Sequence, residues 1–233
     1  MQRPYKKPKN SYNLEIKDIN PLTDNQKRTF KDYKEDKNLL LHGMAGTGKT
    51  FCALYLALLD ILSYKSSKSK VLIVRSAVQT RDVGFLPGSL EEKLKQYETP
   101  YKNICTEIFN RGDAYEMLKT KDILSFVSTS FIRGNTFDDT IIIVDEMQNL
   151  NFHELDSIIT RTGDNSRIIF SGDFRQSDLI SSQDRKGILD FIKILDNMSV
   201  FSKIEFNIED VVRSGLVKDY LIAKHSVFSW HYI

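Results

Sequence analysis

The residues best suited to chemistry lie in one short stretch, where residues 43–50 read GMAGTGKT. The spacing G-x-x-x-x-G-K-T is the phosphate-binding P-loop pattern when a strand precedes it and a helix follows it. An apolar run at 39–41 comes before the loop, and a helical apolar pattern at 51–62 comes after it. The alternative is a glycine-rich turn with an incidental lysine, but strand, loop and helix agree with one another. We therefore predict that the chain binds a nucleoside triphosphate.

Each part of this loop has a physical task. Backbone N–H groups of the loop and of the following helix start point into one concavity and favour an anion there. Lys49 is expected to reach the β- and γ-phosphates, and Thr50 is expected to offer its hydroxyl to Mg²⁺. The residues expected to contact the nucleotide are Gly43, Met44, Ala45, Gly46, Thr47, Gly48, Lys49, Thr50 and Phe51.

A second candidate group follows the apolar run 140–144, where Asp145 and Glu146 stand side by side. In a nucleotide hydrolase, Asp145 would hold Mg²⁺, mostly through water, and Glu146 would polarise the attacking water. Two acids at this place also suit a helix N-terminus, since the macrodipole favours them there. The upstream P-loop favours the catalytic interpretation. Gln176, which follows the apolar run 167–170, is a candidate for sensing the γ-phosphate or orienting the water.

Other polar residues have two interpretations. Gln26 would suit adenine, because an amide donates and accepts on the base edge at once, but it also fits a surface position near a helix start. Arg75, Gln79 and Arg81 lie at the start of a long loop, where they would contact phosphates or bases of a nucleic acid or would simply be solvated. The basic arm 1–12 is either a solvated tail or an arm that attracts nucleic acid.

The order of apolar runs and helical patterns predicts an α/β fold, with a mostly parallel sheet and helices on both faces. The expected strands are 39–41, 71–74, 123–128, 140–144, 167–170 and 200–206. The expected helices are one before residue 38 capped by Thr23 or Asp24, then 51–62, one opened by a capping box at Ser89 and Glu92, 149–162, 188–195 and 216–224. Residues 13–233 are expected to form a single domain, with a loop and helical excursion at about 78–121.

Composition sets limits on the setting. The net charge of +2 gives no global signal for nucleic acid or membrane. The two cysteines, Cys52 and Cys105, exclude a disulfide framework and suit a reducing, cytosolic compartment. No stretch approaches the length of a membrane span, so a cytoplasmic protein without a membrane partner is expected.

Taken together, these motifs resemble the PhoH-like family of P-loop ATPases. The segments that carry the resemblance are 43–50, 82–94, 131–149, 160–179 and 210–221, and they extend over most of the chain from about Gln26 onward. The D-E-x-Q and G-D-x-x-Q boxes are also similar to those of superfamily-1 helicases. The GFLPG segment and the IRG segment ahead of the D-E-x-Q strand are what single out the PhoH-like family.

The resemblance implies a RecA-like, three-layer core, Mg²⁺-dependent ATP hydrolysis and a helicase- or translocase-like link to RNA or DNA. Family members occur in phosphate-starvation regulons and in phage genomes. The residues that match functional positions of the family are Gln26 for adenine, Lys49 and Thr50 of the P-loop, Asp145 for the metal, Glu146 for the water, Gln148 and Gln176 for coupling, and Arg213 for the γ-phosphate. Met147 departs from the family, which usually has alanine there, and nothing here resembles the PIN nuclease fused to some relatives.

One RecA-like core supplies half of an ATP site, because phosphoryl transfer needs a positive charge on the far side of the γ-phosphate. We therefore expect a homo-oligomeric ring, with a hexamer as the leading candidate, in which Arg213 or Arg161 acts from its own or an adjoining subunit. Single-stranded RNA or DNA would pass by the loops at 75–88. The alternatives are an ATP-binding switch for a protein partner and a small-molecule phosphotransferase.

Overall fold

The computed structural model describes residues 14–63, 66–76, 90–132, 134–174 and 182–229. Its centre is a six-stranded sheet in which every neighbouring pair of strands is parallel, in the order β3-β2-β4-β5-β1-β6. The strands are β1 (Asn38–Gly43), β2 (Lys70–Arg75), β3 (Leu124–Ser128), β4 (Thr140–Asp145), β5 (Arg167–Gly172) and β6 (Phe201–Phe206). The predicted α/β fold with a parallel sheet is confirmed.

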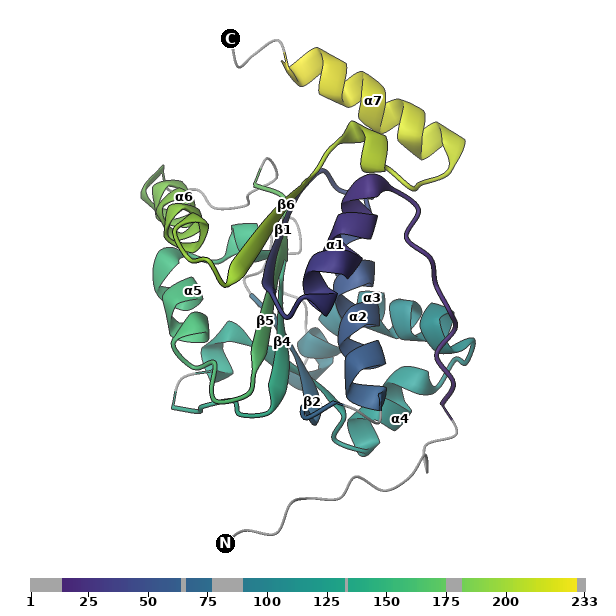
Figure 1. Ribbon diagram of the computed structural model, residues 1–233. Coiled ribbons are helices and arrows are strands. Elements are labelled where there is room, and N and C mark those ends of the chain that lie inside the picture. The colour runs from purple at the N-terminus through teal and green to yellow at the C-terminus, as the bar shows by residue number, and fades with distance from the viewer. Residues whose placement is uncertain (1–13, 64–65, 77–89, 133, 175–181, 230–233) are drawn as a thin grey trace, which may run out of the picture.

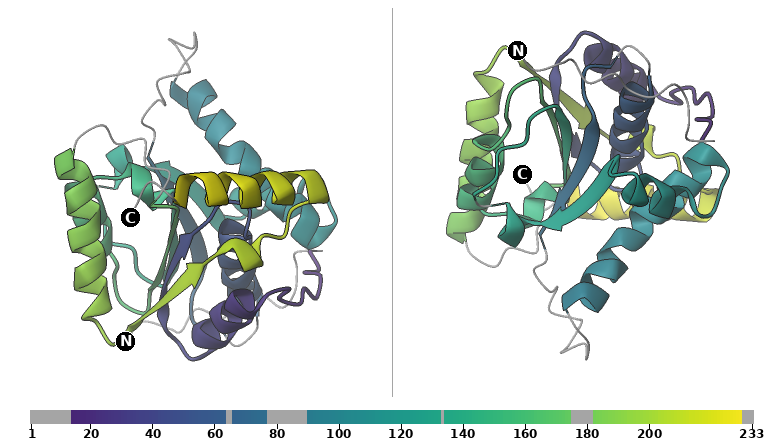
Figure 2. Two further views of the ribbon diagram at one scale, coloured as in Figure 1. Left: turned by 90° about the horizontal axis from the view of Figure 1, so that it is seen from above. Right: turned by 90° about the horizontal axis from the view of Figure 1, so that it is seen from below.

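Helices cover both faces of this sheet (Figure 1). One face carries α1 (Asp24–Lys34), α2 (Lys49–Leu62), α3 (Leu90–Phe109) and α4 (Ala114–Thr120), and the other carries α5 (Phe152–Ile159) and α6 (Ser182–Asp196). Helix α7 (Gly215–Ser229) lies across the upper edge of the sheet (Figure 2). The short 3₁₀ turns are η1 (Thr129–Phe131), η2 (Met147–Asn149) and η3 (Ile208–Asp210). In the described part of the chain, no helix has the length and apolarity needed to cross a membrane.

The strands read as continuous apolar runs because both of their faces are buried. In β1, the side chains of Leu39 and Leu41 pack in the core beneath α1 to α4, and Leu40 packs in the core beneath α5 and α6. In β4, Ile141 joins the first core and Ile142 the second. This alternation is the period of two that a strand imposes, and it divides the apolar residues between two layers.

The segment before α1 is held by α2. The backbone N–H of Ile19 donates to the hydroxyl oxygen of Tyr55 (3.1 Å), and that hydroxyl donates to the carbonyl of Lys17 (3.3 Å). The chain then enters α1 through Thr23, whose side chain accepts from the N–H of Gln26 and caps the helix, as one of the two predicted caps. This anchoring fixes where Gln26 faces.

The predicted helix 149–162 starts too early and ends too late, because α5 spans only Phe152–Ile159. Residues Met147–Asn149 form a 3₁₀ turn, and α5 begins only at Phe152. Asn151 and Glu154 form a reciprocal capping box, with N–H···O distances of 2.9 and 3.0 Å, and this box sets the start of the helix. Helices α6 and α7 are longer than predicted. The first turns of α6 read SQDRKG, and such a polar stretch gives no apolar period. The arm 1–12 and the side chains of the box at 89–92 lie outside the described residues.

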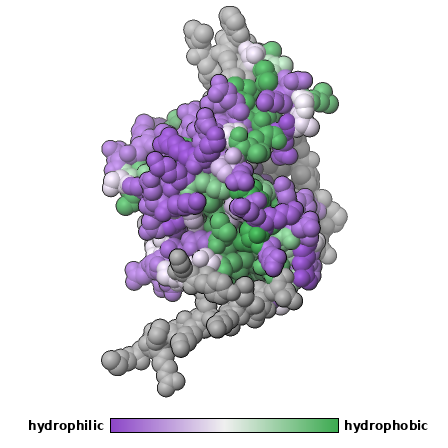
Figure 3. Space-filling model, turned by 45° about the vertical axis from the view of Figure 1, so that its right-hand side comes forward, coloured by the Kyte–Doolittle hydropathy of each residue, from purple (hydrophilic) through white to green (hydrophobic). Residues whose placement is uncertain are grey.

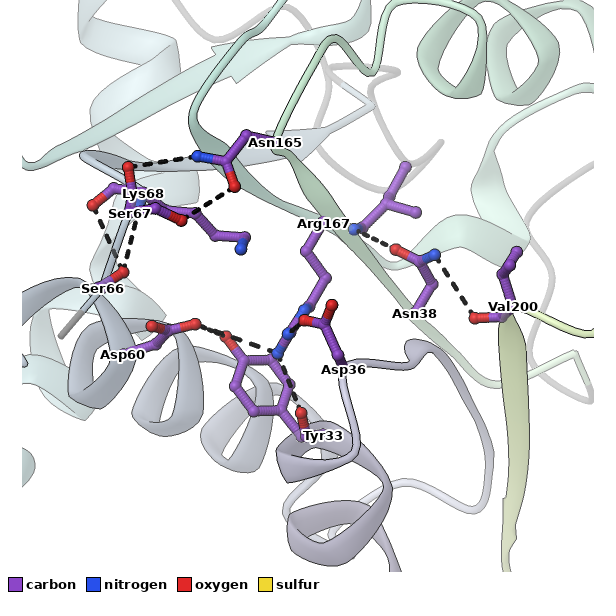
Figure 4. A network of polar contacts seen from close by, with 11 residues as sticks. Tyr33, Asp36, Asn38, Asp60, Ser66, Ser67, Lys68, Asn165, Arg167 and Val200 are labelled. Atoms are coloured by element: carbon purple, nitrogen blue, oxygen red, sulfur yellow. Dashed lines mark hydrogen bonds and ion pairs between the residues drawn. The ribbon is translucent and has the colours of Figure 1, made fainter.

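A partly buried polar network ties the amino-terminal edge of the sheet to the helices (Figure 4). Arg167, at the start of β5, donates to the carbonyl of Tyr33 (3.0 Å), and its guanidinium lies 4.1 Å from the Tyr33 ring centroid. It also forms ion pairs with Asp36 and Asp60. The Tyr33 hydroxyl donates to Asp60 (3.1 Å), so α1, α2 and β5 share one network.

We predict that Arg167→Met destabilises the fold by roughly 2 kcal/mol, because it removes the side-chain hydrogen bond to the Tyr33 carbonyl, the cation–π contact with the Tyr33 ring and the ion pairs with Asp36 and Asp60. The matched control is Arg28→Met, which breaks only an exposed ion pair with Asp32 (3.4 Å) and is expected to cost about 0.5 kcal/mol or less. Urea unfolding midpoints measure both. Equal losses in the two variants would contradict the prediction.

Candidate nucleotide-binding site

The P-loop connects β1 to α2, and α2 begins at Lys49, earlier than the predicted helix start at residue 51. Gly46 and Gly48 have φ angles of 78° and 84°, in the left-handed region that glycine adopts without strain. Gly43 has a φ angle of 118°, and a Cβ there would overlap the carbonyl of Phe206 on β6. The glycines therefore let the loop turn tightly and let β1 pass close to β6.

Lys49 lies buried over the start of its own loop. Its Nζ donates to the carbonyls of Gly43 (2.8 Å) and Met44 (2.7 Å). Burial lowers the pKa of Lys49, and the carboxylates of Asp173, Glu146 and Asp145 act against that shift. The ammonium group thus belongs to the same electrostatic cluster as the predicted catalytic acids.

Asp145 is buried at the end of β4, and both of its carboxylate oxygens accept hydrogen bonds. The Thr50 hydroxyl donates to Oδ1 (2.9 Å), and the Tyr101 hydroxyl from α3 donates to Oδ2 (2.9 Å). A hydroxyl and a carboxylate in contact are the hard oxygen donors that Mg²⁺ prefers. Thr50 and Asp145 therefore fit the predicted metal role, which stays a prediction.

Glu146 and Gln148 join the ends of two strands. Gln148 donates from Nε2 to Glu146 Oε2 (2.5 Å) and accepts at Oε1 from the backbone N–H of Asp173 (3.0 Å), which follows β5. Glu146 has a φ angle of 52°, which is uncommon for a non-glycine residue and is found more often at functional sites. Met147, the departure from the family, is fully buried in the core beneath α5 and α6.

One cavity of about 790 Å³ is lined by residues of the P-loop and by polar residues that follow β4 and β5. Its polar part holds Lys49, Thr50, Asp145, Glu146 and Gln148, and its apolar part is lined by Ile19, Pro21, Leu22, Phe30, Phe51 and Ile104. On the face of the molecule that Figure 3 draws, apolar side chains gather in the middle, with hydrophilic side chains around them. A cavity lined by both polar and apolar side chains suits a ligand with phosphates and a flat base.

Gln26 lines this cavity and is already engaged at both ends of its amide. Nε2 donates to the carbonyl of Thr47 (3.0 Å), and Oε1 accepts from the N–H of Leu22 (2.8 Å). The amide keeps one further N–H and one further lone pair for a ligand. The adenine role stays a prediction, and the structure adds a role that joins the P-loop to the segment before α1.

Arg75 lies inside the cavity, at the end of β2 and in register with Asp145. Its guanidinium lies 5.4 Å from the Tyr97 ring centroid. Burial acts to lower the pKa of Arg75, but Tyr101, Asp145 and Glu146 outweigh it and raise the pKa. The guanidinium of Arg75 thus lies among two tyrosines of α3 and the acids that follow β4, and its predicted contact with nucleic acid stays a prediction.

The two candidate arginines lie at opposite ends of the sheet. Arg213 is an exposed residue of the cavity rim, where its side chain lies next to Gly46 and the N–H of Val212 donates to the carbonyl of Gly46 (3.2 Å). Arg161 follows α5, and its carbonyl accepts from the N–H of Phe137 just ahead of β4. A six-residue strand spans about 20 Å, so Arg161 cannot reach the cavity of its own chain.

Sequence reasoning missed Tyr101, which lies 44 residues from Asp145 along the chain and within a helical stretch that carried no motif. Three predicted residues, Gln79, Arg81 and Gln176, fall outside the described residues.

With this geometry in place, comparison with known proteins is informative. The sequence profile of a family described as "PhoH-like protein" matches residues 18–224. The chain belongs to this family. The resemblance drawn from the motifs is thereby confirmed.

Known relatives are about 31% identical to the chain over the aligned residues. A PhoH-like protein of Mycobacterium leprae is 31% identical over 206 residues, covering 87% of this chain and 57% of the relative. A PhoH-like protein of Bacillus subtilis is 31% identical over 207 residues, covering 88% and 63%. The chain thus spans less than two thirds of the length of these relatives.

Among solved structures, the fold is similar to the large terminase of a thermophilic bacteriophage in complex with ADP. The TM-score is 0.52 at 12% sequence identity, and the match covers 86% of this chain and 49% of the terminase chain. At this identity the likeness concerns the fold alone.

We predict that Gly43→Ala destabilises the protein by about 2 kcal/mol or more, because the new Cβ meets the Phe206 carbonyl in a strained backbone conformation. The control is Gly112→Ala, where a Cβ meets no atom within 4 Å of the described residues. Thermal unfolding with and without ATP measures both variants. A melting temperature of Gly43→Ala equal to that of the control would contradict the prediction.

Proposed function

We propose that this PhoH-like protein is an Mg²⁺-dependent ATPase coupled to single-stranded RNA or DNA. The observation that carries the proposal is the convergence of Lys49, Thr50, Asp145 and Glu146 in one cavity at the carboxyl ends of parallel strands. A site that only bound nucleotide would need the P-loop but would not need Glu146. We further propose that residues 13–233 act as one domain.

The residues divide the work as follows. The loop N–H groups and Lys49 bind and orient the phosphates, and Thr50 and Asp145 would hold Mg²⁺, which neutralises charge on the phosphates when bound. Glu146 is the general base for the attacking water, and its bond to Gln148 limits where its carboxylate points. Because Gln148 also holds the Asp173 backbone, movement of either strand end would alter the position of Glu146.

Support for nucleic acid as the partner comes from the family motifs, since the D-E-x-Q box is similar to that of superfamily-1 helicases. The likeness to a bacteriophage large terminase is compatible with this proposal at the level of fold. On this proposal, ATP hydrolysis would drive movement along a nucleic-acid strand or remodelling of that nucleic acid.

We predict that Glu146→Gln lowers ATP turnover by roughly 10²-fold or more while ATP binding stays close to that of the wild type, because only proton transfer from water is lost. Phosphate release is measured with and without single-stranded RNA and DNA. The matched control is Glu35→Gln, at the exposed end of α1, with turnover expected to match the wild type.

We expect single-stranded RNA or single-stranded DNA to stimulate ATP turnover in the wild type, and we expect this stimulation to vanish in Glu146→Gln. Slow turnover that neither strand changes would count against the nucleic-acid partner. A phosphotransferase would transfer phosphate to an added small molecule in preference to water, and a switch would bind ATP without turnover in the wild type.

We also propose a homo-oligomer in which a neighbouring subunit completes the site. Helix α7 supports this, because it is apolar on several sides and lies beside the P-loop, with Leu221 next to Gly46. Its exposed apolar residues are Leu216, Val217, Tyr220, Ile222 and Val227. On this proposal Arg213 acts on the site of its own chain and Arg161 acts on the site of the next subunit.

Mixing experiments separate these two arginines. Arg161→Ala and Lys49→Ala are each expected to be inactive alone and to recover roughly a quarter of wild-type activity when mixed equally, since one subunit interface in four regains both residues. Arg213→Ala mixed with Lys49→Ala is expected to stay inactive, because no chain then carries both residues. Absence of recovery in the first mixture, with mixed oligomers present by native mass measurement, would contradict a role for Arg161 in trans.

A further inference from the structure

The hydroxyl of Tyr101 is a buried hydrogen-bond donor that contacts Asp145 in the nucleotide site, although Tyr101 belongs to none of the sequence motifs. Tyr101 lies on α3, is fully buried, and packs its ring 5.8 Å from that of Phe126 on β3. Its hydroxyl donates a hydrogen bond to Asp145 Oδ2 (2.9 Å). Asp145 Oδ2 therefore faces a fixed hydrogen-bond donor.

The two oxygens of Asp145 have partners of different kinds. Oδ1 accepts from Thr50, the residue that the proposed function also needs for the nucleotide-bound metal. Oδ2 accepts from Tyr101, which does not line the cavity. When Thr50 turns toward a ligand, Tyr101 is the partner that still fixes the rotation of the Asp145 carboxylate.

A second contact strengthens this arrangement. The guanidinium of Arg75 interacts with the Tyr101 hydroxyl, and the Tyr97 ring, one helical turn before Tyr101, packs against Arg75. Helix α3 thus touches the end of β2 and the end of β4 through one group of side chains. Both are strand ends that line the cavity.

We propose that Tyr101 is a positioning residue for the metal carboxylate: it orients Asp145 so that Oδ1 faces the Mg²⁺ position. This inference rests on the proposed function. Partners that orient a metal ligand set metal affinity, and their loss commonly costs 10- to 100-fold in that affinity. An ordinary structural role is the competing explanation, since a buried tyrosine hydroxyl needs an acceptor wherever it lies.

The chain offers a matched control in Tyr115 on α4. Tyr115 is buried in the same apolar core, and its hydroxyl donates to a buried carboxylate, that of Glu98 (2.7 Å). Neither Tyr115 nor Glu98 lines the nucleotide cavity. Tyr101→Phe and Tyr115→Phe therefore remove the same chemical group from the same core, and only the first touches the site.

The test titrates Mg²⁺ at a fixed concentration of fluorescent ATP analogue and repeats the nucleotide titration in EDTA. In Tyr101→Phe, the Mg²⁺ concentration for half-maximal binding is expected to rise about 10-fold, with affinity in EDTA unchanged within about twofold. Tyr115→Phe is expected to match the wild type in both titrations. Urea unfolding shows whether the two variants lose similar stability, as equal hydroxyl deletions should.

Wild-type Mg²⁺ dependence in folded Tyr101→Phe would overturn the inference and leave the proposed function standing. Wild-type protein whose nucleotide binding ignores Mg²⁺ would overturn both. If Tyr101→Phe does not fold, 4-aminophenylalanine at position 101 keeps the ring and a para donor. The comparison is 4-methylphenylalanine at position 101, which keeps the ring but has no para donor. The inference is supported if the Mg²⁺ concentration for half-maximal binding stays within about twofold of wild type for the amino variant and rises about 10-fold for the methyl variant. Equal Mg²⁺ concentrations for the two variants contradict it.

Discussion

The common direction of the strands is the constraint on which the site depends. Because each neighbouring pair is parallel, the carboxyl ends of β1, β2, β4 and β5 lie at one edge of the sheet. Lys49 and Asp145 are far apart in the sequence, yet the sheet brings both to one cavity. Residues at the opposite edge, such as Arg167, serve stability, and their network holds the helices at that end. The sheet thus separates a functional edge from a structural one.

At the functional edge, groups suited to bind a ligand are bonded to one another. Lys49 donates to loop carbonyls, Thr50 donates to Asp145, and Gln148 donates to Glu146. Each of these bonds offsets part of the cost of burying a polar or charged group. Binding of phosphate and metal would then exchange existing bonds for new ones, and the buried groups would have partners in both states. The carboxylate of Asp145 keeps one bond, from Tyr101, throughout such an exchange.

The features that could be predicted from the sequence are those whose pattern lies within one short stretch of residues. The strands were predicted because their apolar runs reflect burial on both faces, and the P-loop and the acids after β4 were predicted because they are contiguous motifs. The start of α5 was wrong because the Asn151–Glu154 capping box outweighs the apolar period. The contact of Tyr101 with Asp145 and the bond from Gln26 to Thr47 join distant parts of the chain, and no local pattern encodes them.

Helix α7 presents exposed apolar residues beside the P-loop. Apolar residues on several sides of a helix are costly to leave in water, and in the described part of α7 the exposed ones are Leu216, Val217, Tyr220, Ile222 and Val227. Meanwhile Arg161 is a cation at the edge opposite to the P-loop of its own chain. A ring in which α7 is covered by the next subunit, and in which that subunit presents its Arg161 to the cavity, would explain both features with one interface. Since a head-to-tail interface uses two different surfaces, it closes into a ring only when the rotation between subunits permits it.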